Sequence, residues 1–118
     1  MNLFWGRDNK PLETLDWARK LDDAEYRIVA LDYDNEELVV STIWVGIQSP
    51  PPLQDTDETA LIFETAIVNR GLVEEKFRWH SEAEAFEGHD HVCMTTLGRH
   101  ARPEDHYREL VIAAERGR

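Results

Sequence analysis

The chain has 118 residues, with 24 acidic side chains against 13 Lys and Arg, which gives a formal net charge of −11. That length suits a single domain with one hydrophobic core, and a hydrophobic fraction of 42% excludes a disordered acidic tail. No apolar run approaches the ~20 residues that a membrane-spanning helix needs. The amino terminus lacks a basic start followed by a long apolar stretch, so we expect no secretory leader.

The distribution of charge limits the class of partner. Residues 26–80 hold ten acidic and four basic side chains, and no cluster of Lys and Arg occurs anywhere. Direct nucleic-acid binding usually begins with a basic face, so we expect neither nucleic acid nor an anionic membrane as a partner. The single cysteine, Cys93, excludes an internal disulfide framework and fits a cytoplasmic protein. The acidity serves mainly solubility, and it also permits a basic protein partner.

The first expected element is a helix at about residues 11–22. Pro11 suits the first turn of a helix, because its missing N–H has no partner there. Apolar side chains then recur at helical spacing, at Leu12, Leu15, Ala18 and Leu21.

Four strands are expected next, because runs rich in β-branched and aromatic residues alternate with turn residues. The second of these strands is apolar on both faces and should be central in the sheet. The polar, proline-rich segment 48–59 should be an exposed loop. The expected strands are 26–33, 38–47, 60–68 and 73–79.

Two helices should follow the strands. Ser81 with Glu84 three residues later forms a capping box, which predicts a helix that runs to about Leu97 and stops at Gly98. Pro103 opens a last helix, with an apolar stripe of Tyr107, Leu110, Val111 and Ala114. This order predicts one α+β domain over residues 1–118. It consists of a helix, a four-stranded antiparallel meander and two C-terminal helices packed on one face of the sheet.

Acidic residues gather at the first hairpin. Asp32, Asp34 and Glu36 alternate along the end of a strand, so their side chains can share one side, and Glu37 follows them. Such a group can hold a hard cation or form an acidic tip for a basic protein. A solvated hairpin tip is the ordinary alternative. We take these four residues as the candidate binding site.

The segment His89-Asp90-His91-Val92-Cys93 contains zinc-ligand residue types. On a helix, His89 and Cys93 share a face, but His91 points roughly 200° away. Two ligands are too few for a zinc site without a distant third, for which His80, His100 and His106 are available. The sequence therefore predicts no metal and no cofactor, and His89 and Cys93 are the weak metal candidates. A Cys93 nucleophile with His89 as its base is also disfavoured, because Cys93 lies late in its helix.

Three segments in this order resemble a family: VVSTIWVGI (39–47), ALIFETAIV (60–68) and RWHSEAEAFEGHDHVC (78–93). They are similar to small proteins encoded by phages of actinobacteria and by their hosts, a family without an assigned activity. The resemblance covers about half of the chain and implies a phage context. His89 matches the histidine that ends the family's helix motif. The Gln48-Ser-Pro-Pro-Pro loop departs from the family, whose members tend to have an Asp-His-containing loop there.

Three hypotheses follow. The first is an accessory module in the cytoplasm that binds a host protein or a second copy of itself, with an inhibitor that mimics nucleic acid as a subtype. The second is a small metal-dependent enzyme that uses His89 with other histidines. The third is a component of the virion or of its assembly. The sequence leans away from catalysis.

Overall fold

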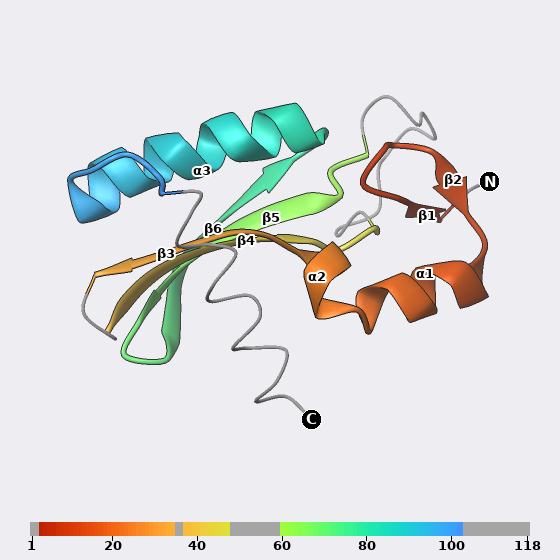
Figure 1. Cartoon of the computed structure of the whole chain (residues 1–118), viewed down its shortest axis with the longest axis horizontal. Helices are drawn as coiled ribbons and strands as arrows, with labels where there is room; N and C mark the ends of the chain where they lie inside the picture. The colour runs from red at the N-terminus through yellow and green to blue at the C-terminus, as the bar shows by residue number, and fades with distance from the viewer. Residues whose placement is uncertain (1–2, 35–36, 48–59, 103–118) are drawn as a thin grey trace.

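The fold is described from a computed structural model, which places residues 3–34, 37–47 and 60–102. Two long hairpins form a four-stranded antiparallel sheet of β3 (Ile28–Asp34), β4 (Leu38–Trp44), β5 (Phe63–Asn69) and β6 (Leu72–Trp79), in the order β3-β4-β5-β6. The sheet twists strongly, and α3 (Glu82–Leu97) lies across one of its faces (Figure 1). The predicted α+β class and antiparallel meander are confirmed. No helix within the described ranges is long and apolar enough to cross a membrane.

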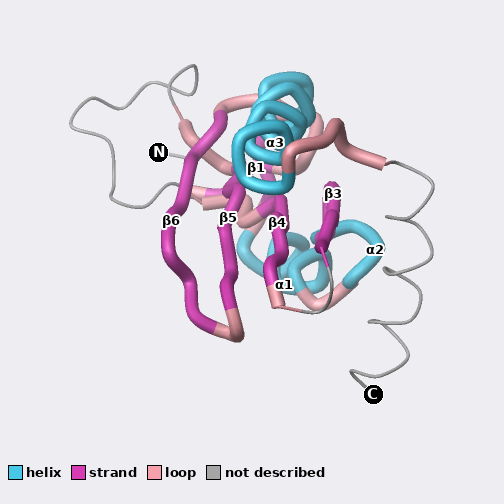
Figure 2. The backbone as a smooth tube through the Cα atoms, turned by 90° about the vertical axis from the view of Figure 1, so that its left-hand side faces the viewer, coloured by secondary structure: helices cyan, strands magenta, loops and turns pink. Residues whose placement is uncertain are grey.

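The amino-terminal part differs from the prediction. The expected helix at 11–22 is shorter, α1 (Thr14–Leu21), because Pro11 and Leu12 instead form β2 and pair with β1 (Phe4–Trp5). Pro11 is tolerated there because this two-stranded ribbon leaves one side of the strand without a ladder. A short α2 (Ala24–Arg27) also replaces the start of the expected strand 26–33. In Figure 2, α3 lies at the top of the sheet, and α1 and α2 lie below it beside β4 and β3.

The strand register separates a covered face from an open face. Ala30, Thr42 and Thr65 occupy one cross-strand row, are buried and face α3. Tyr33 and Val39 begin a row on the other face, where the described side chains keep partial exposure. Among the described helices, α3 is the one that contacts all four strands. The second predicted C-terminal helix, from residue 103, lies outside the described residues.

Helix α3 begins and ends as the sequence predicts. Ser81 is its N-cap, and the Ser81 hydroxyl accepts a hydrogen bond from the backbone N–H of Glu84 at 3.2 Å. Gly98 ends the helix with φ of 71°, a conformation that favours glycine. Between these ends, α3 presents one buried side to the sheet: Ala85, Gly88, His89, Val92 and Cys93.

The core consists of two clusters along the interface between α3 and the sheet. The larger cluster lies toward the start of α3 and contains Trp5, Trp44, Ala60, Ile62, Phe63 and Ala85. The smaller lies toward its end and contains Val40, Ile67, Val92 and Cys93. A set of buried polar side chains lies on the same interface.

Helix α3 approaches the sheet closely at Gly88. A Cβ there would overlap the indole ring of Trp79. Helix propensity alone would make alanine more favourable than glycine here by about 1 kcal/mol. The clash with Trp79 acts in the opposite direction. We expect Gly88→Ala to lower the free energy of unfolding by about 1–3 kcal/mol, as overpacking usually does.

The control is Glu87→Ala at the adjacent exposed position, which should change the free energy of unfolding by less than about 0.5 kcal/mol. Urea unfolding followed by tryptophan fluorescence measures both variants. A Gly88→Ala variant as stable as the parent would show that the Trp79 ring moves aside without cost.

Candidate functional site: a buried carboxylate network

The structure divides the four acidic residues of the predicted binding tip. Asp32 is only 1% exposed, because it faces α3 from β3. Asp34, at the end of that strand, and Glu37, after the turn, are exposed, and Glu36 lies outside the described residues. Asp32 therefore does not belong to a solvated acidic tip, and it forms a site of a different kind.

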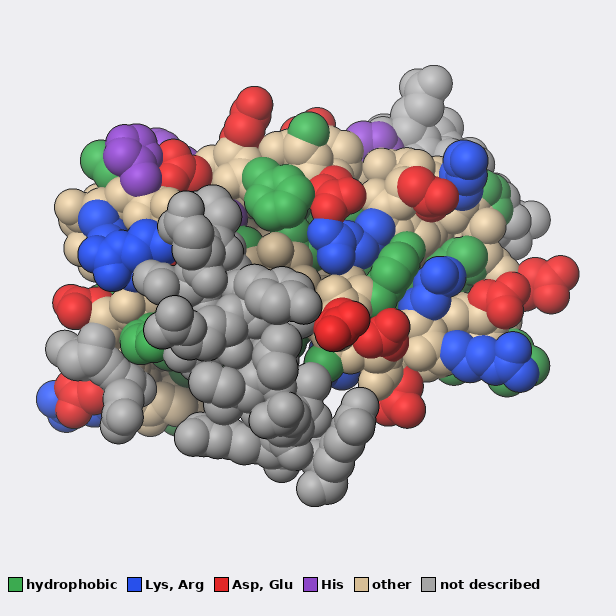
Figure 3. Space-filling model, viewed as in Figure 1, with side chains coloured by type: hydrophobic (Ala, Val, Ile, Leu, Met, Phe, Trp, Pro, Cys, Tyr) green, Lys and Arg blue, Asp and Glu red, His purple; other side chains and the backbone are tan. Residues whose placement is uncertain are grey.

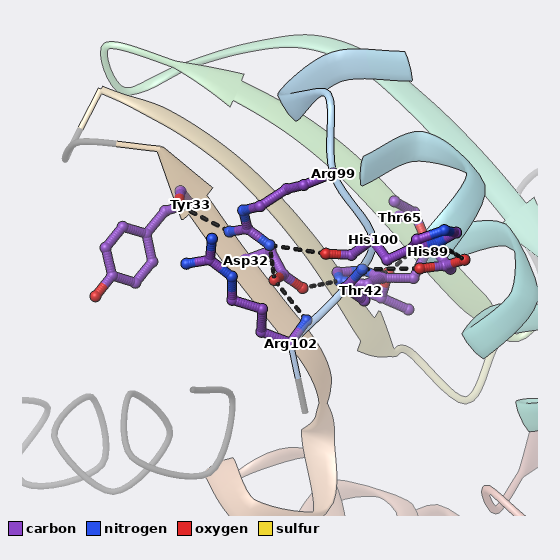
Figure 4. A network of polar contacts seen from close by, with 10 residues as sticks. Asp32, Tyr33, Thr42, Thr65, His89, Arg99, His100 and Arg102 are labelled. Atoms are coloured by element: carbon purple, nitrogen blue, oxygen red, sulfur yellow. Dashed lines mark hydrogen bonds and ion pairs between the residues drawn. The ribbon is translucent and has the colours of Figure 1, made fainter. Parts of the chain in front are cut away.

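His89, Arg99 and the backbone of Arg102 donate hydrogen bonds to the Asp32 carboxylate (Figure 4). His89 Nε2 on α3 lies 2.7 Å from Oδ2. On the segment after α3, Arg99 Nη1 lies 2.8 Å from Oδ1 and the backbone N–H of Arg102 lies 3.0 Å from it. A buried carboxylate is costly unless it is paired and hydrogen-bonded, and here both conditions hold. Asp32 thus connects β3, α3 and the segment that follows α3.

The other nitrogen of His89 continues the network into the sheet. Nδ1 lies 2.7 Å from the Thr42 hydroxyl, which lies 2.5 Å from the Thr65 hydroxyl. Trp79 Nε1 donates to Thr65 Oγ1 at 2.9 Å. The Trp79 indole donates but cannot accept, so the hydroxyl proton of Thr65 has Thr42 as its acceptor within this network. The directions of the remaining hydrogen bonds follow from this one. Thr65 donates to Thr42, Thr42 donates to Nδ1, and Nε2–H donates to Asp32.

The Cys93 thiol completes the group. Burial, followed by the charge of Asp32 and a hydrogen bond to that carboxylate, raises the pKa of Cys93 to about 12. The thiol is therefore protonated at neutral pH. A nucleophilic cysteine needs a thiolate, so this environment opposes the chemistry considered from the sequence. The shared helix face of His89 and Cys93 is confirmed.

The donor atoms of Asp32, His89 and Cys93 lie within 4.8 Å of one another, and zinc binds these residue types. Each donor is already used, however. Both ring nitrogens of His89 make hydrogen bonds, and the Cys93 thiol is held protonated. The Arg99 guanidinium supplies the positive charge next to the carboxylate. The geometry favours a closed hydrogen-bond network over a metal centre.

The other described histidines do not join His89. His80 Nδ1 contacts the carbonyl oxygen of Ala60 at 2.9 Å, and His91 is exposed. His100 Nδ1 lies 2.9 Å from Asp90 Oδ2 on the surface. The described residues therefore do not form the cluster of histidines that the hypothesis of a metal-dependent enzyme calls for.

Asp90 holds the segment after α3 from its other side. Its Oδ1 accepts the backbone N–H of Ala101 at 2.8 Å, and its Oδ2 contacts His100. The backbone hydrogen bond from Ala101, followed by the one from His100, lowers the pKa of the Asp90 carboxyl. Residues 99–102 are thus fixed between two carboxylates, Asp32 on the sheet and Asp90 on the helix.

Sequence reasoning missed the main partner of His89. Asp32 lies 57 residues away along the chain and Arg99 lies 67 residues from Asp32, so no local spacing links them. One signal was present. Asp32 shares its strand face with Ala30, so alternation alone places a carboxylate on the apolar side of the strand.

Comparisons with known proteins assign the chain to no family. No family model matches the chain, and neither a curated protein nor a solved structure matches it.

The buried position of Asp32 leads to a direct test. Asp32→Asn keeps the shape but removes the charge that balances Arg99. We expect the free energy of unfolding to fall by roughly 3–5 kcal/mol, the usual cost of breaking a buried ion pair. Asp34→Asn makes the same change at an exposed position of the same strand and should cost less than about 0.5 kcal/mol. Equal effects in chemical denaturation would contradict the network.

The Cys93 pKa predicts a sensitivity to alkali. Below the ordinary thiol pKa of 9.0, the thiol is protonated in both the folded and the unfolded chain. Above it, the unfolded chain loses the proton and the folded chain retains it, so stability falls as pH rises toward about 12. Cys93→Ser keeps a donor for Asp32 but does not ionise in this range.

We therefore expect the free energy of unfolding of the parent to fall relative to that of Cys93→Ser between pH 9 and pH 11. Urea unfolding at each pH measures both. Lys and Tyr titrate in both proteins and cancel in the difference. A pH-independent difference would mean that the Cys93 thiol titrates normally in the folded chain.

Proposed function

We propose that the chain is a small accessory protein of the phage type that acts in the cytoplasm by binding another protein. The support comes from the surface, since the one cluster of reactive residue types described above is buried and fully hydrogen-bonded. The observation that carries the proposal is an exposed leucine among carboxylates at one end of the sheet.

The acidic end, as we name it, consists of Asp34, Glu37, Leu72 and Glu74. The register aligns Asp34, Leu38, Asn69 and Leu72 across the four strands. The turns of both hairpins therefore lie at the same end of the sheet. Leu72 is 73% exposed, and the three carboxylate residues are also exposed. Figure 3 shows acidic side chains at the left-hand end of the molecule, where the hairpins of Figure 1 end.

This chemistry favours a basic partner. An exposed apolar side chain supplies an anchor that can be buried in a complex, and surrounding charge steers the partner and sets its orientation. Glu37 already pairs with Arg70 at 3.5 Å, an exposed contact that contributes little. The net charge of −11 opposes contact between two copies at this end. A protein segment with Lys or Arg around an apolar residue is the complementary surface.

Such a surface also suits an inhibitor that occupies the nucleic-acid site of another protein, because carboxylates can stand in for phosphates. Direct binding of nucleic acid by this chain is not part of the proposal. The metal-dependent enzyme is less favoured, because the donors of the Asp32 network are used by one another and by Arg99.

The test is an affinity pull-down from a nuclease-treated lysate of the source cells. Asp34→Lys with Glu37→Lys reverses two charges of the acidic end, and Asp16→Lys with Glu87→Lys makes the same change at exposed positions on α1 and α3. We expect one stoichiometric protein to be retained by the parent and by the α1/α3 variant. We expect at least tenfold less with the acidic-end variant. Equal retention by both variants would place the binding surface elsewhere.

A further inference from the structure

The two edges of the sheet differ in whether their backbone groups are used. At β3, Arg99 Nη2 donates to the carbonyl oxygen of Tyr33 at 3.0 Å, so the segment after α3 occupies part of this edge. β6 forms the other edge, beside β5 (Figure 2). Within the described ranges, no hydrogen bond reaches the backbone of β6 from its outer side. This side presents the row of backbone groups with which a further strand can pair.

β6 is also exposed over most of its length. Its first five residues are exposed, with exposed fractions of 73% for Leu72 and 53% for Val73. The register shift lies between Val73 and Glu75, and from Glu75 to Trp79 the pairing with β5 is regular. The regular part therefore has the length of an ordinary short strand, and the apolar residues precede it.

The turn before β6 determines which of its amides point outward. Arg70 and Gly71 have φ of 52° and 80°, as in a two-residue hairpin turn of type I′. The residues that flank such a turn, here Asn69 and Leu72, form a hydrogen-bonded pair. Bonded and non-bonded pairs alternate along an antiparallel ladder. Every second residue of β5, counted back from Asn69, therefore directs its backbone polar groups toward β6.

Thr65 is one of these β5 residues, and its partner in β6 is Phe77. The Phe77 amide therefore points toward β5. The amides of its two neighbours, Lys76 and Arg78, point away from β5 because the direction alternates along the strand. These N–H groups are the donors that an added strand would use in the regular part of β6.

The side chains near this edge indicate the chemistry of the added strand. β6 carries two acidic and two basic side chains. The basic ones, Lys76 and Arg78, both contact Glu64 on β5, at 4.0 and 3.4 Å. With Glu64 included, an added strand meets one more carboxylate than cation. Glu74 and Glu75 follow the exposed leucine and valine directly, so an apolar segment with Lys or Arg is complementary to this half of the strand.

The same charges oppose a second copy as the added strand. Two identical strands that pair antiparallel about a two-fold axis place one residue opposite itself. In the regular part of β6, a centre at Glu75, Lys76 or Arg78 places that charge opposite its own copy. A centre at Phe77 places Lys76 opposite Arg78. Like charges directly opposite each other are destabilising, so these registers are disfavoured.

We infer that the partner contributes an extended segment, in which apolar residues alternate with Lys or Arg, and that this segment pairs with β6 as a fifth strand of the sheet. The inference rests on the proposed function, which supplies the partner, and it adds the manner of binding. Main-chain hydrogen bonds to Lys76 and Arg78 give affinity, and contacts at Leu72 and the adjacent carboxylates give specificity.

The experiment uses the full chain, ¹⁵N-labelled, with a blocked hexapeptide of alternating valine and lysine as the probe. We expect saturating peptide to slow hydrogen exchange of the Lys76 and Arg78 amides by at least about tenfold, because they become hydrogen-bonded. The Phe77 amide already faces β5 and should change less. A hexapeptide of alternating valine and glutamate is the matched control and should bind at least about tenfold more weakly.

A pair of variants separates the backbone from the side chain. Lys76→Pro removes the outward N–H, and proline is tolerated on an edge strand where that N–H faces solvent. Lys76→Ala removes the same side chain but keeps the N–H. We expect Lys76→Pro to bind the valine–lysine peptide at least about tenfold more weakly than Lys76→Ala does, because a ladder hydrogen bond is lost. Hydrogen exchange in the parent tests the inference even where the proline variant does not fold.

Three results would overturn the inference: no binding of the valine–lysine peptide at millimolar concentration, unchanged exchange of the two outward amides at saturation, or equal binding by the two variants. The pull-down tests the proposed function separately. A protein retained there by the parent, together with any of these results, leaves the proposed function in place with another manner of binding. An empty pull-down with an edge that the peptide protects contradicts the proposed function alone.

Discussion

A single buried carboxylate, that of Asp32, determines how the parts of this molecule meet. It lies on the edge strand β3 and is 1% exposed. It accepts hydrogen bonds from His89 on α3 and from Arg99 and Arg102 on the segment after α3. Removing such a charge from water costs several kcal/mol, and the donors and the guanidinium offset that cost in the observed arrangement. The carboxylate therefore favours this mutual placement of the helix, the edge strand and the segment.

The same arrangement gives residue types that often act in catalysis a role in holding the fold together. A histidine, an aspartate and a cysteine within 4.8 Å suggest chemistry, but catalysis needs access and an unused lone pair or proton. His89 makes hydrogen bonds with both nitrogens, and the raised pKa keeps Cys93 protonated. The described polar groups of the network hydrogen-bond to one another, which supports the proposal that the chain acts by binding through its surface.

Local patterns predicted the sheet and α3 well, because their signals lie within a few residues: β-branched runs, turn residues and the Ser81 cap. The prediction that Pro11 begins a helix was wrong. A proline fits the first turn of a helix and also a strand position whose N–H has no partner, and here Pro11 pairs with Trp5 in the two-stranded ribbon. The role of Asp32 depended on partners more than fifty residues away, which no local pattern encodes. For the same reason local alternation did not separate the two aspartates of the predicted tip: Asp34 is exposed, whereas Asp32, two positions earlier, is buried.

The central claim is that His89 is a fixed member of a hydrogen-bond network, with the proton on Nε2 facing Asp32 and a bare Nδ1 accepting from Thr42. Long-range ¹H–¹⁵N correlation spectra of the ¹⁵N-labelled protein at neutral pH measure this directly, because protonated and bare ring nitrogens differ widely in chemical shift. The account predicts the neutral Nε2–H form for His89, unchanged by a chelator. A proton on Nδ1 alone, or nitrogen shifts that change on addition of the chelator, would contradict it.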